Sequence, residues 1–238
     1  KKLDPGRTDR TLPLRISAVL DIVHDAVPPD TIVLTGAGHS QAQFLQEYTV
    51  NDASQVISPN GFSTMGFTVP GAIGAKLAAP DRPVLGFAGD GDFLMTVQEL
   101  AMAVQYDLDV VYVVVDNAGW QSIRDLQMDV YGEDHGFAAE FRDTAGESIA
   151  PDLVTVARGF GVQAEQATDE RALKGAIGRA LASGGPTVIV VPVRREFPES
   201  AGPVSGWWDV PVPASLPKRR KTYEREVAPV RRDAVKRS

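Results

Sequence analysis

Four short runs of apolar residues stand out along the chain: Thr31–Leu34, Val84–Phe87, Val110–Val115 and Thr187–Val191. The apolar positions in these runs are continuous rather than alternating, which is typical of strands that are buried on both faces of a parallel sheet. We therefore predict four parallel strands at these positions.

Segments with helical periodicity lie before and between the strands. Ile16, Leu20, Val23 and Val27 share one helical face. Similar patterns predict helices over Met95–Tyr106, Pro151–Phe160 and Glu170–Ala182, the last ended by Gly184-Gly185-Pro186. This alternation predicts an α/β fold with a doubly wound, mostly parallel sheet and helices on both faces. Ligands of such sheets bind beyond the carboxyl ends of the strands.

The composition changes after Pro198 to proline, glycine, tryptophan and charged residues. We therefore expect one domain over residues 1–198 and a C-terminal arm over residues 199–238. The arm contains Trp207 and Trp208 beside prolines. Because adjacent aromatic side chains favour burial, we expect the arm to pack on a partner or over the site.

Composition narrows the class of protein. The 238 residues are 43% hydrophobic and 23% charged, which excludes wholesale disorder. The chain has no cysteine, which excludes disulfides and thiolate chemistry, and its three scattered histidines do not suggest a histidine-built metal site. No apolar run approaches the roughly 20 residues of a membrane span, and the N-terminus does not resemble a secretory signal. We expect a cytoplasmic enzyme or binding domain that does not act at a membrane.

The net charge of −7 is unevenly distributed. Residues 201–238 contain nine Lys and Arg and four Asp and Glu, a net charge of +5, which leaves a net charge of −12 on the first 200 residues. An acidic body argues against nucleic acid as a partner, because backbone binding needs clustered cations. The basic stretch Lys218-Arg219-Arg220-Lys221 either touches an acidic surface or is a solvated end.

Loops rich in Gly, Asp or Asn follow three of the predicted strands. The first strand leads into Thr35-Gly36-Ala37-Gly38-His39-Ser40, a turn whose backbone N–H groups could face a phosphate. Gly89-Asp90-Gly91-Asp92 and Asp116-Asn117-Ala118-Gly119 follow the next two, and their carboxylate, amide and carbonyl oxygens suit Mg²⁺. The arrangement predicts a Mg²⁺–diphosphate site at one sheet edge. The alternatives are a glycine-rich turn without a ligand, and Asp90 and Asp116 as helix caps.

These residues also carry a family resemblance. Gly89-Asp90-Gly91, followed after 25 residues by Asn117, resembles the thiamine diphosphate fingerprint, in which Gly-Asp-Gly precedes Asn-Asn at a similar distance. Gly61–Ala75 is similar to the stretch before that motif in acetohydroxyacid (acetolactate) synthases and their relatives. Residues Thr11 to Arg194 thus resemble the diphosphate-binding domain of that superfamily, and the expected cofactors are thiamine diphosphate and Mg²⁺.

The resemblance implies a role for each matched residue. Asp90, Asn117 and the Gly119 carbonyl would hold Mg²⁺. Met65 would support the bent form of thiamine, which brings the cofactor's imino nitrogen to its reactive carbon, and the Ser63 carbonyl would accept from its pyrimidine amino group. The expected cofactor-binding set is Gly38, His39, Ser40, Ser63, Met65, Gly89, Asp90, Gly91, Asp92, Asn117, Gly119 and Trp120.

The sequence departs from the family pattern at several positions. Asp116 replaces the first asparagine, Asp92 replaces a common serine, and Leu126 stands where acetohydroxyacid synthases carry a tryptophan that selects the acceptor. Asp92 adds negative charge near a diphosphate, so we expect its carboxyl group to be protonated, to be hydrogen-bonded or to weaken binding. These departures leave the substrate open.

We call the predicted Mg²⁺-binding loop Asp116-Asn117-Ala118-Gly119 the metal loop. Four residues that follow it are candidates for contact with the substrate. Gln121 could donate a hydrogen bond and His135 could move a proton, and these two are the candidate catalytic residues. Trp120 could form a wall of the pocket, and Arg124 could hold a substrate anion. The alternatives are core packing for Trp120, a surface salt bridge for Arg124 and a solvated loop for His135.

The resemblance also implies a partner. Enzymes of this superfamily take an activating glutamate from a pyrimidine-binding domain, and we find no segment here that would form one. We therefore expect a second chain to carry that domain, in a heterotetramer of two such chains and two partners.

The expected function is that of an acetolactate synthase-like carboligase acting on a small 2-oxo acid. A 2-oxo acid decarboxylase and a hydrolase of a cyclic diketone are the alternatives within the class. A non-catalytic thiamine diphosphate-binding module is the alternative outside it. A nucleotide-binding Rossmann protein fits less well, because Gly36-Ala37-Gly38 lacks the third glycine of that motif.

Overall fold

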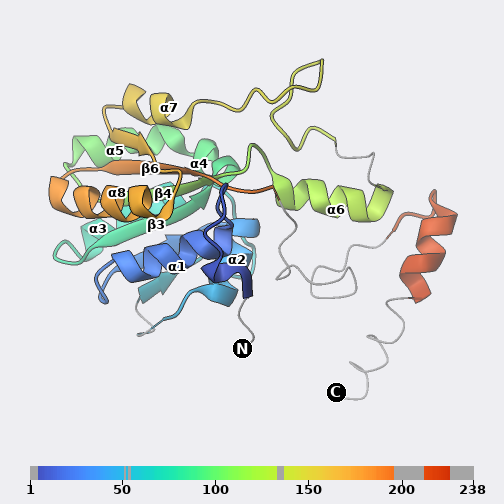
Figure 1. Cartoon of the computed structure of the whole chain (residues 1–238), viewed down its shortest axis with the longest axis horizontal. Coiled ribbons are helices and arrows are strands. Elements are labelled where there is room, and N and C mark those ends of the chain that lie inside the picture. Colours follow the sequence, from blue (N-terminus) through green and yellow to red (C-terminus); the bar gives the residue numbers. More distant parts are fainter. Residues whose placement is uncertain (1–4, 51, 53–54, 133–136, 196–211, 226–238) are drawn as a thin grey trace.

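Six parallel strands form a single sheet in the order β2-β1-β3-β4-β6-β5 (Figure 1). The computed structural model describes residues 5–50, 52, 55–132, 137–195 and 212–225. The strands are β1 (Ile32–Thr35), β2 (Val56–Ile57), β3 (Val84–Gly89), β4 (Val111–Asp116), β5 (Gln163–Gln166) and β6 (Thr187–Pro192). The predicted doubly wound α/β fold is confirmed.

Helices cover both faces of the sheet. One face is packed by α1 (Ile16–Ala26), α2 (His39–Glu47) and α8 (Glu170–Ser183). The other is packed by α3 (Thr68–Ala78), α4 (Asp90–Met95), α5 (Leu100–Gln105) and α7 (Leu153–Gly159). Two short 3₁₀ helices of the described residues, η1 (Pro5–Thr8) and η3 (Val97–Glu99), also belong to this body. Among the helices of the described ranges, none has the length and apolar character needed to cross a bilayer.

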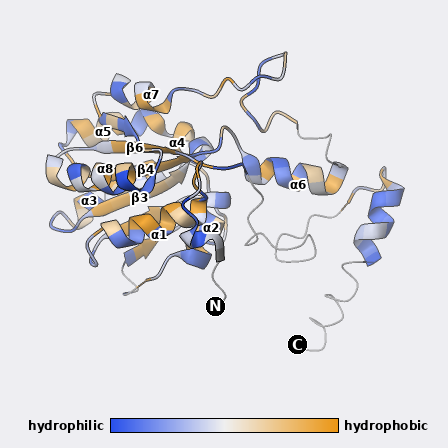
Figure 2. Cartoon of the chain, in the orientation of Figure 1, coloured by the Kyte–Doolittle hydropathy of each residue, from blue (hydrophilic) through white to orange (hydrophobic). Residues whose placement is uncertain are grey.

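The sheet divides the core into two layers. Along β4, Val111, Val113 and Val115 contact the α1–α8 layer, whereas Tyr112 and Val114 contact the α3–α7 layer. All five side chains are essentially inaccessible to solvent. Burial on both faces explains why the central strands are continuous apolar runs, and Figure 2 shows these strands as mainly hydrophobic.

The sequence predicted the four central strands to within two residues but missed both edge strands. The single helix expected over Met95–Tyr106 is wrong: α4 ends at Met95, and α5 begins only at Leu100 after a 3₁₀ turn. The interruption lies at Thr96, whose φ of −137° and ψ of 26° are not helical. The predicted stop after α8 is confirmed, because Gly184 ends that helix with a left-handed φ of 71°.

The chain reverses its direction across the sheet between β1 and β3. These two strands are hydrogen-bonded neighbours, although β2 lies between them in the sequence, and β4 pairs with the far side of β3. The carboxyl ends of β1, β3 and β4 therefore meet at one edge of the sheet. Ligands of doubly wound folds bind at such a reversal point.

A second helical unit extends away from the sheet edge (Figure 1). It consists of α6 (Gln121–Tyr131) and a C-terminal segment, residues 212–225. Val212 and Tyr223 pack against Val130, and the Arg219 guanidinium donates to the Val130 carbonyl at 2.7 Å and the Met128 carbonyl at 3.1 Å. The described part of the arm thus binds the C-terminal end of α6. Trp207 and Trp208 lie outside the described residues.

Candidate functional site

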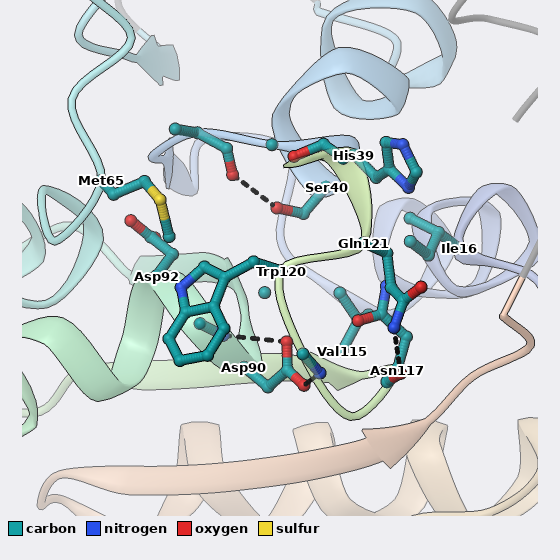
Figure 3. Close-up of a pocket in the computed structure, with 16 residues that line it drawn as sticks. Ile16, His39, Ser40, Met65, Asp90, Asp92, Val115, Asn117, Trp120 and Gln121 are labelled. Carbon is teal, nitrogen blue, oxygen red and sulfur yellow. Dashed lines mark hydrogen bonds between the residues drawn. The ribbon is translucent and has the colours of Figure 1, made fainter. Parts of the chain in front are cut away.

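An open pocket lies at the carboxyl ends of β1, β3 and β4. Figure 3 shows Met65 at one end and Asn117 with Gln121 at the other, with Asp90 and Trp120 below and His39 with Ser40 above. The residues that line the pocket are Ile16, Ala37, Gly38, His39, Ser40, Met65, Gly89, Asp90, Gly91, Asp92, Val115, Asn117, Gly119, Trp120, Gln121 and Ser122.

The pocket brings together nearly all of the residues singled out from the sequence. Of the expected cofactor-binding set, Ser63 alone does not line the pocket. Its hydroxyl donates to the Gln41 side chain, and its φ is 49°. His135 lies outside the described residues. Sequence reasoning missed Ile16, Ala37, Val115 and Ser122 as lining residues, because core or turn positions of this kind carry no chemical signal.

The turn after β1 leads directly into the start of α2. Gly38 precedes α2 with φ of 90° and ψ of −160°, a conformation that favours glycine. The first backbone bond of the helix runs from the Ala42 N–H to the Gly38 carbonyl at 3.0 Å. First-turn N–H groups have no acceptor within a helix, so the start of α2 presents donors beside the pocket. This arrangement suits a phosphate group.

Asp90 is a buried carboxylate that joins two strand-end loops. Its Oδ1 accepts from the Gly91 N–H at 2.8 Å, and its Oδ2 accepts from the Gly119 N–H at 2.7 Å. Burial raises the pKa of Asp90 to about 7, and the nearby Asp116 adds to the shift. A buried carboxyl group with a raised pKa would be stabilised in its ionised form by a bound cation.

Asn117 supplies a second oxygen beside the pocket. Its Oδ1 is buried and has no hydrogen-bond partner within the described part of the chain. An unsatisfied buried oxygen costs free energy unless a donor or a cation meets it. Asp90 and Asn117 are therefore a donor set that fits a hard divalent cation such as Mg²⁺.

The helix-cap alternative does not account for the two aspartates. Gly89 is the N-cap of α4 and Trp120 is the N-cap of α6, and neither helix has a side-chain cap bond. Asp90 instead bonds across to Gly119, and Asp116 Oδ1 accepts from the Ala118 N–H within its own loop at 2.9 Å. The carboxylates organise the loops rather than the helix ends.

Asp92 joins separate segments beneath the pocket. One oxygen accepts from the Gly66 N–H at 2.6 Å and the other from the Thr68 hydroxyl. A Cβ atom at residue 36 would lie 2.4 Å from both carboxyl oxygens, so a side chain there would displace the Asp92 carboxyl group. Burial raises the pKa of Asp92, while these hydrogen bonds act to lower it. Of the outcomes expected for this carboxyl group, the structure shows the hydrogen-bonded one.

His39 is paired with a carboxylate of α6. Its Nε2 lies 3.2 Å from Asp125 Oδ2, and both side chains are largely buried. Burial lowers the pKa of His39 to about 4. The lowered pKa favours the neutral ring at pH 7, and the ring lies within hydrogen-bond distance of the Asp125 carboxylate.

The residues that follow the metal loop form a wall of the pocket. The Trp120 ring packs against Gly91, where a Cβ would lie 2.6 Å from Nε1, and its centroid is 4.9 Å from that of Phe141. Gln121 is buried, and its Nε2 donates to the Asn117 carbonyl at 3.3 Å. Arg124 forms an ion pair with Glu140 at 3.2 Å, as the salt-bridge alternative expects.

Taken together, these features define an α/β domain that can hold a diphosphate and a divalent cation at one sheet edge. The chain belongs to the thiamine pyrophosphate enzyme family: residues 36–191 match its C-terminal TPP binding domain. Enzymes of this acetolactate synthase-like superfamily use thiamine diphosphate with Mg²⁺.

Relatives of known activity are much longer than this chain. A 3D-(3,5/4)-trihydroxycyclohexane-1,2-dione hydrolase of Lacticaseibacillus casei is 31% identical over 204 residues, which are 85% of this chain and 31% of the relative. An acetolactate synthase large subunit of Parasynechococcus marenigrum is 38% identical over 179 residues, 74% of this chain and 27% of the relative. The chain thus spans about a third or less of these proteins.

A solved structure shares the fold. The thiamine diphosphate-dependent 4-hydroxybenzoylformate decarboxylase of Rhodococcus jostii RHA1 superimposes with a TM-score of 0.70. The match covers 82% of this chain and 35% of that one at 24% identity.

Proposed function

We propose that this chain is the diphosphate-binding part of an enzyme that makes or breaks a C–C bond next to a carbonyl, as an acetolactate synthase-like carboligase on a 2-oxo acid. The observation that carries the proposal is the meeting in one pocket of Asp90, the start of α2 and the Asn117 oxygen, which has no partner among the described residues. Thiamine diphosphate, when bound, supplies a nucleophilic carbon and an electron sink.

The residues of the chain would hold and orient this cofactor. Asp90, Asn117 and the Gly119 carbonyl would bind Mg²⁺, and the N-terminal turn of α2 would bind the diphosphate. Met65 stands at the opposite end of the pocket from Asn117 (Figure 3), where it would support the bent cofactor. Gln121 would orient a substrate oxygen through its side-chain amide.

The proposed enzyme includes a second chain that carries a pyrimidine-binding domain with the activating glutamate, in a cytoplasmic assembly of two plus two chains. Exposed apolar side chains on two segments that contribute to the pocket support such an interface. Phe62 is 96% exposed on the segment that carries Met65, and Ile123 is 44% exposed on α6. Large apolar groups exposed next to a site favour contact with a partner.

Hydrolysis of a cyclic dione is the second candidate reaction. The match to the L. casei dione hydrolase reaches 85% of this chain, whereas the match to the acetolactate synthase reaches 74%. The match to the dione hydrolase therefore extends over a larger part of this chain. The higher identity, 38% against 31%, favours the synthase.

The test is to isolate the tagged chain gently with thiamine diphosphate and Mg²⁺ and to weigh the complex by native mass spectrometry. A complex with a second protein and one cofactor per pair supports the two-chain enzyme. The complex is then assayed for carboligation of pyruvate and for hydrolysis of a trihydroxycyclohexanedione, with Asp90→Asn as the inactive control. Cofactor-loaded chain without a partner and without either activity would favour a binding module instead.

A further inference from the structure

A short segment around Glu140 pairs with the metal loop, although it lies about 20 residues further along the chain. The Trp120 N–H donates to the Ala139 carbonyl at 2.8 Å, and the Phe141 N–H donates to the Ala118 carbonyl at 3.2 Å. Gly119 and Glu140 face each other in this antiparallel bridge. We call residues 139–141 the loop clamp.

The loop clamp sets the orientation of one peptide group. The N–H of Trp120 and the carbonyl of Gly119 belong to the same planar trans peptide, so the two bonds point in opposite directions. Because the N–H is bonded to Ala139, the Gly119 carbonyl points away from the clamp. The other face of Gly119 is fixed as well, since its own N–H donates to Asp90.

The approach of the clamp is too close for any side chain at position 119. A Cβ there would lie 2.5 Å from the Ala139 carbonyl oxygen and 2.8 Å from the Glu140 Cα. Gly119 also has a φ of 144°, which L-residues with side chains rarely adopt. Both the close contact and the backbone conformation therefore favour glycine at position 119.

Three arginines hold the clamp through a single carboxylate. Glu140 Oε2 lies 3.0 Å from Nε of Arg142, the residue after the clamp, and 3.2 Å from Nε of Arg124 on α6. Glu140 Oε1 lies 3.2 Å from Nη1 of Arg195, after β6. Only 16% of the Glu140 side chain is exposed, and its Oε1 also lies 3.5 Å from the Gln121 amide. Charge-assisted bonds of this kind fix the clamp relative to both α6 and the sheet.

We propose that Glu140 is a positioning residue for the cation site: it anchors the loop clamp, and the clamp directs the Gly119 carbonyl toward the cation. This inference rests on the proposed binding of Mg²⁺ by Asp90, Asn117 and Gly119. Groups that orient metal ligands typically change metal affinity when they are removed. Glu140 itself would not contact the cation, the cofactor or the substrate.

The test measures cation affinity directly, with Mn²⁺ as a paramagnetic probe. The full chain, with any partner that copurifies, is titrated with Mn²⁺ at saturating thiamine diphosphate, and free Mn²⁺ is followed by electron paramagnetic resonance. We expect Glu140→Ala to raise the Kd for Mn²⁺ about tenfold. Glu140→Gln, which keeps one acceptor oxygen, is expected to recover part of the affinity.

Two further variants separate the possible outcomes. Glu165 lies on the distant β5 and forms an exposed ion pair with Arg179 of α8, so Glu165→Ala is expected to leave the Kd unchanged. Asp90→Asn is expected to remove Mn²⁺ binding. If Asp90→Asn removes binding but both Glu140 variants bind like the wild type, the positioning role is wrong.

If Asp90→Asn binds Mn²⁺ as the wild type does, or if the wild type does not bind, the cation site is wrong and the positioning role falls with it. Far-UV circular dichroism at the assay temperature establishes that each variant is folded. If Glu140→Ala does not fold, Glu140→Gln decides alone, and an unchanged Kd for that variant overturns the proposal.

Discussion

The carboxylate of Asp90 accepts a 2.7 Å hydrogen bond from the backbone N–H of Gly119, so the loop after β3 is joined directly to the loop after β4. The bond aligns two of the groups that we propose as cation ligands. The two loops can meet because β3 and β4 are parallel neighbours and therefore end at the same edge of the sheet.

We expect Asp90→Asn to weaken Mg²⁺-dependent binding of thiamine diphosphate more than about 100-fold, because the amide keeps the shape but removes the charge that attracts the cation. Isothermal titration calorimetry with and without Mg²⁺ measures this loss. The exposed Asp30→Asn is the matched control. An unchanged Kd for the Asp90 variant would remove this residue from the cation site.

Replacement of Asp92 is expected to destabilise the fold rather than only the site. Asp92→Ala leaves the buried Gly66 N–H and the Thr68 hydroxyl without their acceptor, at a cost of about 2–4 kcal/mol in the free energy of unfolding. Urea unfolding measures the change, with the exposed Asp81→Ala as the control. A change below about 1 kcal/mol would show that other groups take over these hydrogen bonds.

His39 is expected to give the protein a defined pH dependence. Its pKa is about 4 in the folded state and 6.5 without burial, so the unfolded chain binds more protons between these values. Stability is therefore complete above pH 6.5 and falls as the pH drops toward 4, by about 3 kcal/mol in total.

The comparison is between the wild type, His39→Gln and the surface variant His24→Gln. Urea unfolding from pH 4 to pH 7.5 should show a shallower slope for His39→Gln only. Imidazole titration by nuclear magnetic resonance gives the pKa directly. A His39 pKa near 6.5 or above would contradict the prediction and would make the contact with Asp125 an ion pair.

Met65 is expected to affect turnover more than binding. In the reconstituted enzyme, Met65→Ala should lower kcat about tenfold or more, because support for the reactive cofactor geometry is lost, while the Kd for thiamine diphosphate changes much less. Met95→Ala is the matched control, since Met95 is 54% exposed and lies outside the pocket lining. Equal turnover for both variants would remove the role assigned to Met65.

The central strands and the strand-end loops could be predicted from the sequence, because burial on both faces leaves a continuous apolar run. The edge strands could not. In β2, Val56 is half-buried and Ile57 is exposed, and β5 is Gln-Ala-Glu-Gln with only Ala164 buried. Edge positions of this kind do not carry the pattern of a buried strand.

Long-range contacts were beyond sequence reasoning. The acceptor role of Asp92 depends on Gly66 and Thr68, which lie 26 and 24 residues away. The bridge between Gly119 and Glu140 joins a loop to a segment without regular apolar spacing. Helix α3 was also missed, because Pro70, Gly71 and Gly74 disfavour a helix locally. There, Gly71 permits close packing, since a Cβ would lie 3.1 Å from Leu34.

The separation between the sheet edge and α6 has an evolutionary consequence. The groups proposed to hold the diphosphate lie on a rigid, buried edge of the sheet, whereas one wall of the pocket begins on a helix that extends away from that sheet (Figure 1). Substitutions at exposed positions of α6, such as Ile123, therefore cost the folding core little. Such a division lets descendants of one cofactor-binding scaffold acquire new substrates while the scaffold itself stays the same.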